Sequence, residues 1–298
     1  MIGRVTHQTI QRSTLGNLQL NLDAMADLQA KMSGGKKITT PSDDPAGTSD
    51  SLRLRAEKRA AEQYARNADD GDAWLTTVDS SLQTSVTALR RARDLAIQGT
   101  NGAMGPASRE ALAVEIEGVR DSLVEQANAS YLGRSVFAGT SDAGYAFTGP
   151  TGTPPYTFSG TPGATVDRRL SAQTTVRVDA DGAAIFGSGS GSVFDAVTKT
   201  IESLRKGEDA TVNLTNLQAS FKNIVSGRAE IGTRQVQLER AGNVNTELEA
   251  TLDAQKMGIE KADLGSVIMD LKLQETNYQV ALAATARVLQ PTLMDFLR

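Results

Sequence analysis

Apolar side chains near the N-terminus recur every three or four residues. The stripe consists of Leu15, Leu18, Leu22, Met25 and Met32, with Gln29 at the intervening position. Such spacing keeps one narrow apolar face along a helix and is typical of a coiled-coil seam. The pattern therefore predicts an N-terminal helix that pairs with another helix.

The C-terminal end carries a stripe of the same kind. Its apolar members are Leu264, Ile268, Leu271, Tyr278, Leu282, Leu289 and Phe296, with Glu275 and Thr285 as polar interruptions. The stripe begins upstream with Leu238, Ala241, Leu248, Leu252 and Ile259, where Asn245 and Gln255 occupy the remaining positions. We expect each terminus to pair with the other terminus, with a neighbouring copy, or with both.

A simple energy comparison indicates that the terminal helices need partners. Five to eight seam residues contribute on the order of 10 to 20 kcal/mol gross when each is worth roughly 1.5 to 3 kcal/mol. Ordering some 35 residues costs about 1 to 2 kcal/mol per residue. An isolated terminal helix is therefore expected to be disordered, and to fold only against another helix.

The region between the stripes begins with a turn and a long helix. Pro41 and Pro45 bracket the turn, and helix-forming residues run from Ala46 to about Gln98. We expect a solvated break in this helix around Gly71, next to three aspartates. One side of its second half is lined by Trp74, Leu75, Val78, Leu82, Val86 and Leu89.

A second helix follows and folds back. Asn101, Gly102 and Gly105 end the long helix, and Pro106 suits the first position of the next one. Leu112, Ile116, Val119 and Leu123 share one face of that next helix. The two helices are predicted to form an antiparallel hairpin.

Composition changes sharply after Ala138. Residues 139–192 are rich in Gly, Pro, Thr and Ser, and short alternating runs such as 175–178 indicate strands. Asp181-Gly182 is a common hairpin signal. Helix resumes at 193–204, breaks at 206–209, and continues from about Asn213.

The predicted fold is mainly α: an elongated antiparallel helical bundle or coiled coil formed by both chain ends, with a small inserted β-rich outer domain. The scarcity of aromatic residues, 4% of the chain, favours such thin bundles. The expected parts are an N-terminal axial segment (1–40), the helical domain (41–139 and 193–260), the inserted outer domain (140–192) and a C-terminal axial segment (261–298).

Charge and composition argue against several classes of partner. The net charge of −4, with both signs interleaved, provides no strong field for nucleic acid or an anionic membrane. Cysteine is absent, and no apolar run is long enough to span a membrane. The N-terminus lacks the apolar stretch of a secretory signal, so we expect a cytoplasmic chain or one exported without a cleaved signal peptide.

No set of residues indicates catalysis. Gly187 to Ser192 does not have the spacing of a phosphate-binding loop and is interpreted as a linker. Asp179 and Asp181 resemble the start of a calcium loop, but the later ligands are missing. His7 is the only histidine, and the sequons at Asn128 and Asn213 carry little weight. We therefore expect no enzyme activity, no cofactor and no metal site.

Several segments together resemble a known family. Residues 28–45 contain a helix end, a Ser/Gly-rich joint, a basic pair and the turn Pro-Ser-Asp-Asp-Pro. Further matching residues are Asn128, Leu132-Gly133, 136–140, Arg228 to Arg234, 262–264, Tyr278, 281–282 and 293–297. Over roughly 1–140 and 193–298 the chain resembles the flagellin family, and the acidic turn resembles its hook-associated branch.

This resemblance implies a structural adaptor that joins the flagellar hook to the filament. The implied partners are other copies in a ring, hook-associated protein 1, flagellin and an export chaperone. It also implies secretion through the flagellar type III apparatus to an extracellular junction, and terminal helices that order on assembly. Pro291 and Arg298 resemble filament flagellins, so a minor filament flagellin is the alternative.

Overall fold

The computed structural model describes residues 2–100, 104–149, 156–161, 163–208 and 211–288. The chain divides into two compact units. Unit 1 comprises residues 1–59 and 249–298, so it is built from both ends of the chain, and unit 2 comprises residues 60–248. The predicted five-part division of the chain stays a prediction.

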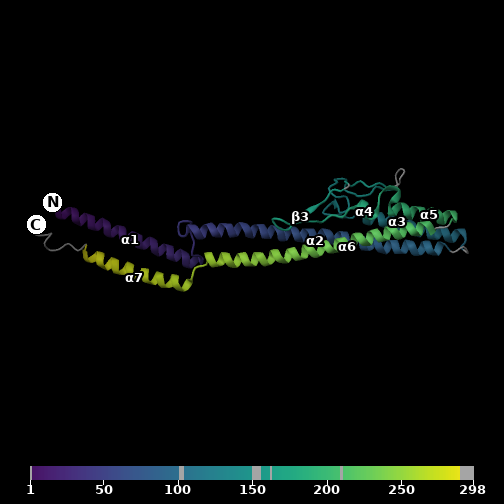
Figure 1. Cartoon of the computed structure of the whole chain (residues 1–298). Helices are drawn as coiled ribbons and strands as arrows, with labels where there is room; N and C mark the ends of the chain where they lie inside the picture. Colours follow the sequence, from purple (N-terminus) through teal and green to yellow (C-terminus); the bar gives the residue numbers. More distant parts are fainter. Residues whose placement is uncertain (1, 101–103, 150–155, 162, 209–210, 289–298) are drawn as a thin grey trace. The chain divides into compact units, whose positions relative to one another are not determined.

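Unit 1 contains the two terminal helices, α1 (Ile2–Gly34) and α7 (Leu264–Val288). They contact each other and lie side by side in Figure 1. They run antiparallel, since Gln274 bonds to Asn21 and an antiparallel bridge joins Lys36 to Lys261. Helices therefore form where the two apolar stripes predicted them.

Two long helices contribute residues to both units: α2 (Pro45–Gly99) and α6 (Thr211–Glu260). Within unit 2, α3 (Pro106–Ala127) follows α2 and packs on α5 (Val193–Lys206). Arg91 of α2 forms an ion pair with Glu115 of α3. The predicted start of α3 at Pro106 is confirmed.

The core of unit 2 lies where the helical pattern placed it. The predicted face of α2 is buried at every position, namely Trp74, Leu75, Val78, Leu82, Val86 and Leu89. It joins Ile116 and Leu123 of α3 and Ile224, Ile231 and Leu238 of α6 in one cluster. Because these residues recur with the helical period, the sequence could predict their shared burial.

The β part of unit 2 is small. Strands β1 (Ser130–Tyr131) and β2 (Arg134–Ser135) form one antiparallel pair, and β3 (Asp167–Arg169) and β4 (Thr175–Arg177) form another. A buried aromatic cluster in this part of the chain contains Phe137, Phe147, Tyr156, Phe186 and Phe194. The fold is thus mainly α with a small β part, as predicted.

The expected helix break at Gly71 was wrong, because α2 continues through this position. Gly71 is buried, and a Cβ atom there would lie 3.0 Å from Val178 and 3.2 Å from Leu238. The glycine lets the segment after β4 and helix α6 approach α2 closely. The glycine at position 71 is therefore explained by tertiary packing and not by a turn.

The expected hairpin at Asp181-Gly182 was also wrong. The short helix α4 (Gly182–Phe186) begins there, and the carboxylate of Asp181 accepts a hydrogen bond from the amide of Ala184. Aspartate caps helix N-termini as readily as it enters turns, so the dipeptide alone was ambiguous. The interpretation of Gly187 to Ser192 as a linker holds, because it spans a 3₁₀ turn, η1 (Gly189–Gly191), and ends with Ser192 capping α5.

The segment Arg228 to Arg234 does not open the last long helix, as the resemblance implied. It lies inside α6, which already begins at Thr211. Arg228 instead forms an ion pair with Asp79 of α2. Nothing in a helical periodicity distinguishes the start of a helix from its interior when strong capping residues are missing.

Candidate assembly interface

The face that α1 turns toward α7 can be read from its partly buried side chains. Six of them alternate by four and three residues: Thr14, Leu18, Asn21, Met25, Leu28 and Met32. Asp27 and Lys31, which form an ion pair with each other, are also partly buried. This is the heptad spacing of a helix pair. No side chain of α1 among those described is fully buried, so the pairing with α7 covers this face only in part.

Helix α7 presents a matching face. Its buried and partly buried positions include the series Val267, Leu271, Gln274, Tyr278, Ala281 and Thr285, again four and three residues apart. Gln274 donates a hydrogen bond from Nε2 to Oδ1 of Asn21, at 3.1 Å. The intramolecular pairing therefore uses one stripe on each helix, and both stripes contain polar positions.

The predicted seam residues divide into two groups. Five of them lie on these paired stripes: Leu18, Met25, Met32, Leu271 and Tyr278. Five others are exposed beside them: Leu15, Leu22, Leu264, Ile268 and Leu282. Leu289 and Phe296 lie outside the described residues. The role of all twelve in assembly stays a prediction.

The predicted seams do not include the remaining positions of each paired stripe. Leu28 and Val267 belong to the intramolecular face, and so do polar residues such as Asn21 and Gln274. On each helix the predicted seam and the stripe that pairs within the chain are two adjacent heptad registers, and both registers contain apolar residues in similar number. A search for paired polar residues at heptad positions could have indicated the second register.

Further apolar side chains point away from the helix pair. Met269, Leu273 and Val280 are exposed on α7, and Leu20 is exposed on α1. Together with the exposed members of the predicted seam they leave much of the apolar surface of both helices uncovered. Exposed apolar surface of this extent is typical of a protein interaction site.

Backbone hydrogen bonds join the segment after α1 to the segment before α7. The amide of Lys37 donates to the carbonyl of Glu260 at 2.7 Å, and the amide of Ala262 donates to the carbonyl of Gly35 at 3.0 Å. Gly35 has a φ of 63°, which glycine adopts without strain. The Gly-rich joint recognised in the sequence thus gives the chain its turn out of α1.

The Glu260 carboxylate anchors this joint to α2. It accepts hydrogen bonds from the hydroxyl of Ser51 and, at 2.6 Å, from the guanidinium of Arg55. Burial by itself raises the pKa of Glu260. These two hydrogen bonds, together with the positive charges of Arg55 and Lys256, outweigh burial, so the pKa lies below its ordinary value. Glu260 therefore stays charged at neutral pH.

The acidic turn before α2 is held by its own side chains. The Asp43 carboxylate accepts hydrogen bonds from the amides of Thr40 and Thr39, at 2.9 and 2.8 Å, and from both threonine hydroxyls. The amide of Thr40 and the hydroxyl of Thr39 contribute most to lowering the pKa of Asp43. Asp44 accepts from the amide of Gly47 at 2.9 Å, as an N-cap does. The first residues of the turn are thus ordered by local bonds.

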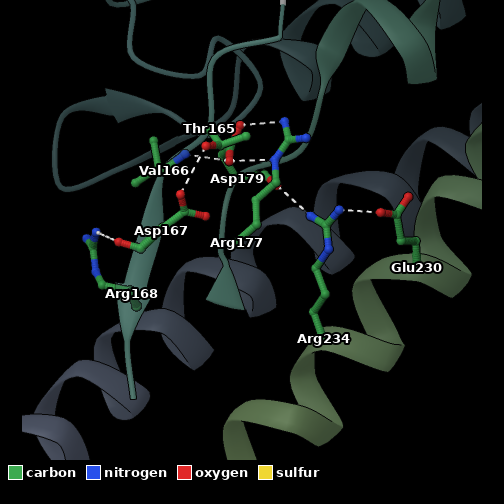
Figure 2. A network of polar contacts seen from close by, with 8 residues as sticks. All are labelled: Thr165, Val166, Asp167, Arg168, Arg177, Asp179, Glu230 and Arg234. Carbon is green, nitrogen blue, oxygen red and sulfur yellow. Dashed lines mark hydrogen bonds and ion pairs between the residues drawn. The ribbon is translucent and has the colours of Figure 1, made fainter. Parts of the chain in front are cut away.

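A polar network in unit 2 joins the segment around β3 and β4 to α6 (Figure 2). Asp179 is fully buried, and its carboxylate accepts bonds from Arg177 at 2.8 and 2.9 Å and from the amide of Val166 at 2.8 Å. The carbonyl of Asp179 accepts from Arg234 of α6 at 2.9 Å, and Arg234 also pairs with Glu230. The hydrogen bond to Asp179 raises the pKa of Arg177.

These contacts give a structural role to residues with noteworthy sequence patterns. Arg234 and Glu230 belong to the segment that resembles the flagellin family, and here they attach a loop to a helix. The sequence around Asp179 resembles the start of a calcium loop, but the Asp179 carboxylate forms an ion pair with Arg177. Among the described residues no group of three or more His, Cys, Asp or Glu side chains could hold a metal ion.

Two further sequence hypotheses concern single residues. Asn128 caps α3, and its side-chain amide bonds to the backbone of Phe147, while Asn213 bonds to Lys199 and Ser203. Both sequon asparagines therefore have structural contacts. Of His7 only the backbone, within α1, is described. None of the helices in the described ranges is long and apolar enough to cross a membrane.

Comparison with known proteins gives a consistent result. The bacterial flagellin N-terminal helical region matches residues 5–142. The chain is 25% identical to flagellar hook-associated protein 3 of Salmonella typhimurium, over 93% of this chain and 94% of that protein. It is 31% identical to flagellin A of Vibrio anguillarum, but over only 47% of this chain and 35% of that flagellin.

A solved structure shows the same fold. The flagellar junction protein of Legionella pneumophila superimposes with a TM-score of 0.59, covering 71% of this chain and 99% of that protein, at 16% identity. At this identity the likeness concerns the fold alone. The similarity in sequence to hook-associated protein 3, in contrast, extends over nearly the whole chain.

Proposed function

From the premise that this chain is a flagellin-family protein and a structural component of the bacterial flagellum, we propose that it joins the flagellar hook to the filament. The extent of the similarity supports this choice within the family. Hook-associated protein 3 matches from end to end, whereas the flagellin match is confined to less than half of the chain. A structural role without enzyme activity follows from the family.

The uncovered apolar surface of α1 and α7 is the observation that carries the proposal. Leu15 is 63% exposed, Leu282 is 42% exposed, and neither lies on the stripe by which the two helices pair. Each exposed leucine gains roughly 1.5 to 3 kcal/mol when it is fully buried. Neighbouring copies in a ring would supply that burial, so the terminal helix pair is the assembly surface.

Assembly is proposed to be coupled to folding of the termini. Within one chain the α1 and α7 stripes include Thr14, Asn21, Gln274 and Thr285, so a single helix pair buries little apolar surface. Contacts with neighbours would add the missing stabilisation and order both helices. This dependence would prevent polymerisation before the subunits reach the growing structure.

The proposed partners follow from the position of a junction ring. One surface would contact hook-associated protein 1 on the hook side, and another would contact flagellin on the filament side. An export chaperone would cover the C-terminal stripe before export through the flagellar type III apparatus. The assembled protein would then be extracellular.

Electron microscopy of cells that lack this chain tests the proposal. We expect hooks without filaments, with unassembled flagellin in the medium, because filament growth would have no adaptor to start from. Reintroducing the wild-type chain should restore filaments. Filaments that remain attached to hooks in the deletion strain would contradict the junction role.

A minor filament flagellin is the second candidate, and one observation favours it: the N-terminal helical region is that of flagellins, and flagellin A is the more identical relative over the part that aligns. Immunogold labelling separates the two roles. A junction protein is labelled only where hook and filament meet, whereas a minor flagellin is labelled along the filament.

A further inference from the structure

The β1–β2 hairpin presents an unusual side chain to solvent. The register pairs Tyr131 with Arg134, so Leu132 and Gly133 form a two-residue turn. Leu132 is 81% exposed and has a φ of 48°, a left-handed conformation that leucine rarely adopts. Asparagine or glycine is the usual choice at such a position. Within the chain, both the exposure and the conformation of Leu132 are unfavourable.

The hairpin is held rigidly by α2. The ring of Tyr131 packs on Trp74 with centroids 5.5 Å apart, and its hydroxyl donates to Asp70 at 3.4 Å. Arg134 is exposed beside Leu132 and forms no ion pair within the part of the chain that the structure describes. The hairpin tip therefore offers an apolar side chain next to a free positive charge.

A groove of about 540 Å³ lies between α2 and α6 elsewhere on unit 2. Small residues such as Ala68, Gly232 and Gly242 form part of its lining. Gly232 stands inside a helix, where glycine is unfavourable, and a Cβ atom there would meet no atom within 4 Å. No contact in the described part of unit 2 requires a glycine at this position. A side chain of another molecule that enters the groove would require one, because a larger residue at position 232 would occupy that space.

The charge of the groove is opposite to that of the hairpin tip. Asp69, Asp72 and Glu239 line it, and its described lining contains no lysine or arginine. None of these three carboxylates forms an ion pair with another described residue. The groove would therefore suit a partner that places a leucine against Ala68, Gly232 and Gly242 and an arginine next to the three carboxylates.

The two surfaces lie on nearly opposite sides of α2. Successive residues of a helix are separated by about 100°. Asp70 and Trp74, which hold the hairpin, therefore point away from the side on which Ala68 and Asp72 line the groove. A hairpin tip cannot reach the groove of its own chain across the helix, but it can reach that of a neighbouring copy.

We propose that the Leu132 hairpin of one copy inserts into the α2–α6 groove of the next copy, with Arg134 facing Asp69, Asp72 and Glu239. Because the hairpin and the groove are different surfaces, the contact is head-to-tail and repeats from copy to copy around a ring or along a helical array. The inference rests on the proposed assembly of copies in the flagellum, and it assigns a second, outer contact besides the terminal helices.

Cysteine cross-linking tests the contact directly, because the natural chain contains no cysteine. The double variant Leu132→Cys with Val236→Cys places one thiol on the hairpin tip and one in the groove lining. In flagella purified from cells that produce only this variant, mild oxidation should give a ladder of covalent oligomers on a denaturing gel. The two single variants should give no ladder.

A matched pair controls for random collisions. Leu132→Cys with Val114→Cys uses a valine of α3 that is 54% exposed, compared with 43% for Val236, and lies outside the groove. This pair should stay monomeric. A ladder of equal strength from the control pair would overturn the proposal. The proposal would also be overturned if the Leu132→Cys, Val236→Cys chain stayed monomeric on the gel although the filaments of these flagella are attached normally.

Two further variants separate assembly from folding. Leu132→Asn suits the left-handed turn, and Gly232→Leu favours the helix while filling the groove. We expect the Tm of each unassembled variant to equal or exceed that of the wild type, while its recovery in purified flagella falls at least about ten-fold. Wild-type recovery of both variants would overturn the outer contact and leave the junction role standing. If the wild-type chain itself is missing from the junction, the proposed function fails first, and this inference fails with it.

Discussion

Glu260 keeps its negative charge in a nearly buried position because two donors replace the water it loses. Ser51 and Arg55, one turn apart on α2, both bond to it, and its own carbonyl accepts the amide of Lys37. The same residue therefore links α2, the end of α6 and the segment after α1. A carboxylate with a lowered pKa stabilises the folded state above its ordinary pKa, and this contribution is lost as the pH falls through the folded value.

Replacing Glu260 with Gln should weaken this joint at neutral pH. The free energy of opening, measured by hydrogen exchange at the Lys37 amide, is expected to fall by about 1 kcal/mol, since Arg55 is half exposed and the bonds are charge-assisted. The ordinary pKa of the carboxyl is 4.5. The difference in the free energy of opening between the wild type and Glu260→Gln should therefore shrink as the pH falls below 4.5 and through the lowered pKa of the folded state.

Glu57→Gln is the matched control for this prediction. Glu57 is exposed on α2, the helix that carries Ser51 and Arg55, and among the described residues it forms an ion pair only with Arg53, at 3.4 Å. Its loss should therefore change the exchange rate very little. An effect of Glu260→Gln that is independent of pH, or as small as that of the control, would contradict the assigned role of the charge.

The terminal helices show how one element can carry more than one interface. On α7 the stripe through Leu271 and Tyr278 faces α1, while Leu282 and Ile268 lie on a neighbouring stripe that is exposed. Because heptad positions on adjacent stripes differ by one residue, the two contacts can form at the same time. Each stripe then has its own partner, the first in the chain itself and the second in a neighbour.

Aspartate substitutions should separate these two stripes. Leu282→Asp is expected to leave the helix content of the unassembled chain unchanged and to cost at least about 2 kcal/mol in association, roughly a thirty-fold loss of incorporation into flagella. Leu271→Asp should lower incorporation further, because it also removes the contact by which α7 pairs with α1 in the assembled chain. The helix content of the unassembled chain should again stay unchanged, since the terminal helices order only on assembly. Both variants should leave the α2–α3 hairpin folded. Circular dichroism and immunoblots of purified flagella measure the two effects.

Asn277→Asp provides the control, because Asn277 is an exposed polar residue of the same helix. It should assemble normally. Normal incorporation of both Leu271→Asp and Leu282→Asp would exclude the terminal helices as the assembly surface.

At the scale of the whole molecule the two units differ in how much they bury. Nearly all fully buried large side chains belong to unit 2, whereas the described side chains of α1 are at best half-buried. Local stability follows the density of buried contacts. Unit 2 should therefore stay folded in the unassembled chain under conditions in which the terminal segments open.

Limited proteolysis measures this difference. Trypsin should cut the unassembled chain first at terminal sites such as Lys31 and Lys261, and leave a fragment that contains most of residues 60–248. In intact flagella the same sites should be cut at least about ten times more slowly, because neighbours order the helices. Terminal segments that resist trypsin equally well in both states would contradict coupled folding and assembly.

The sequence by itself determined the helices, the buried face of α2 and the resemblance to the flagellin family. These features are encoded locally: Pro106 marks a helix start, and the residues from Trp74 to Leu89 recur with the helical period. The family signal likewise lies in short continuous segments, such as the acidic turn that Asp43 and Asp44 order through bonds to their neighbours in the chain.

Only the tertiary structure decided what depends on residues far apart in the chain. Gly71 is needed because Val178 and Leu238 pack against it, and Asp181 caps a helix whose Ile185 and Phe186 are buried in the core of unit 2. The stripe that pairs α1 with α7 includes the hydrogen bond between Asn21 and Gln274, which are far apart in the chain. The groove beside Gly232 likewise exists only once α2 lies against α6. The physical reason is common to all four: local propensity allows several conformations or registers of similar energy, and packing against distant residues selects one of them.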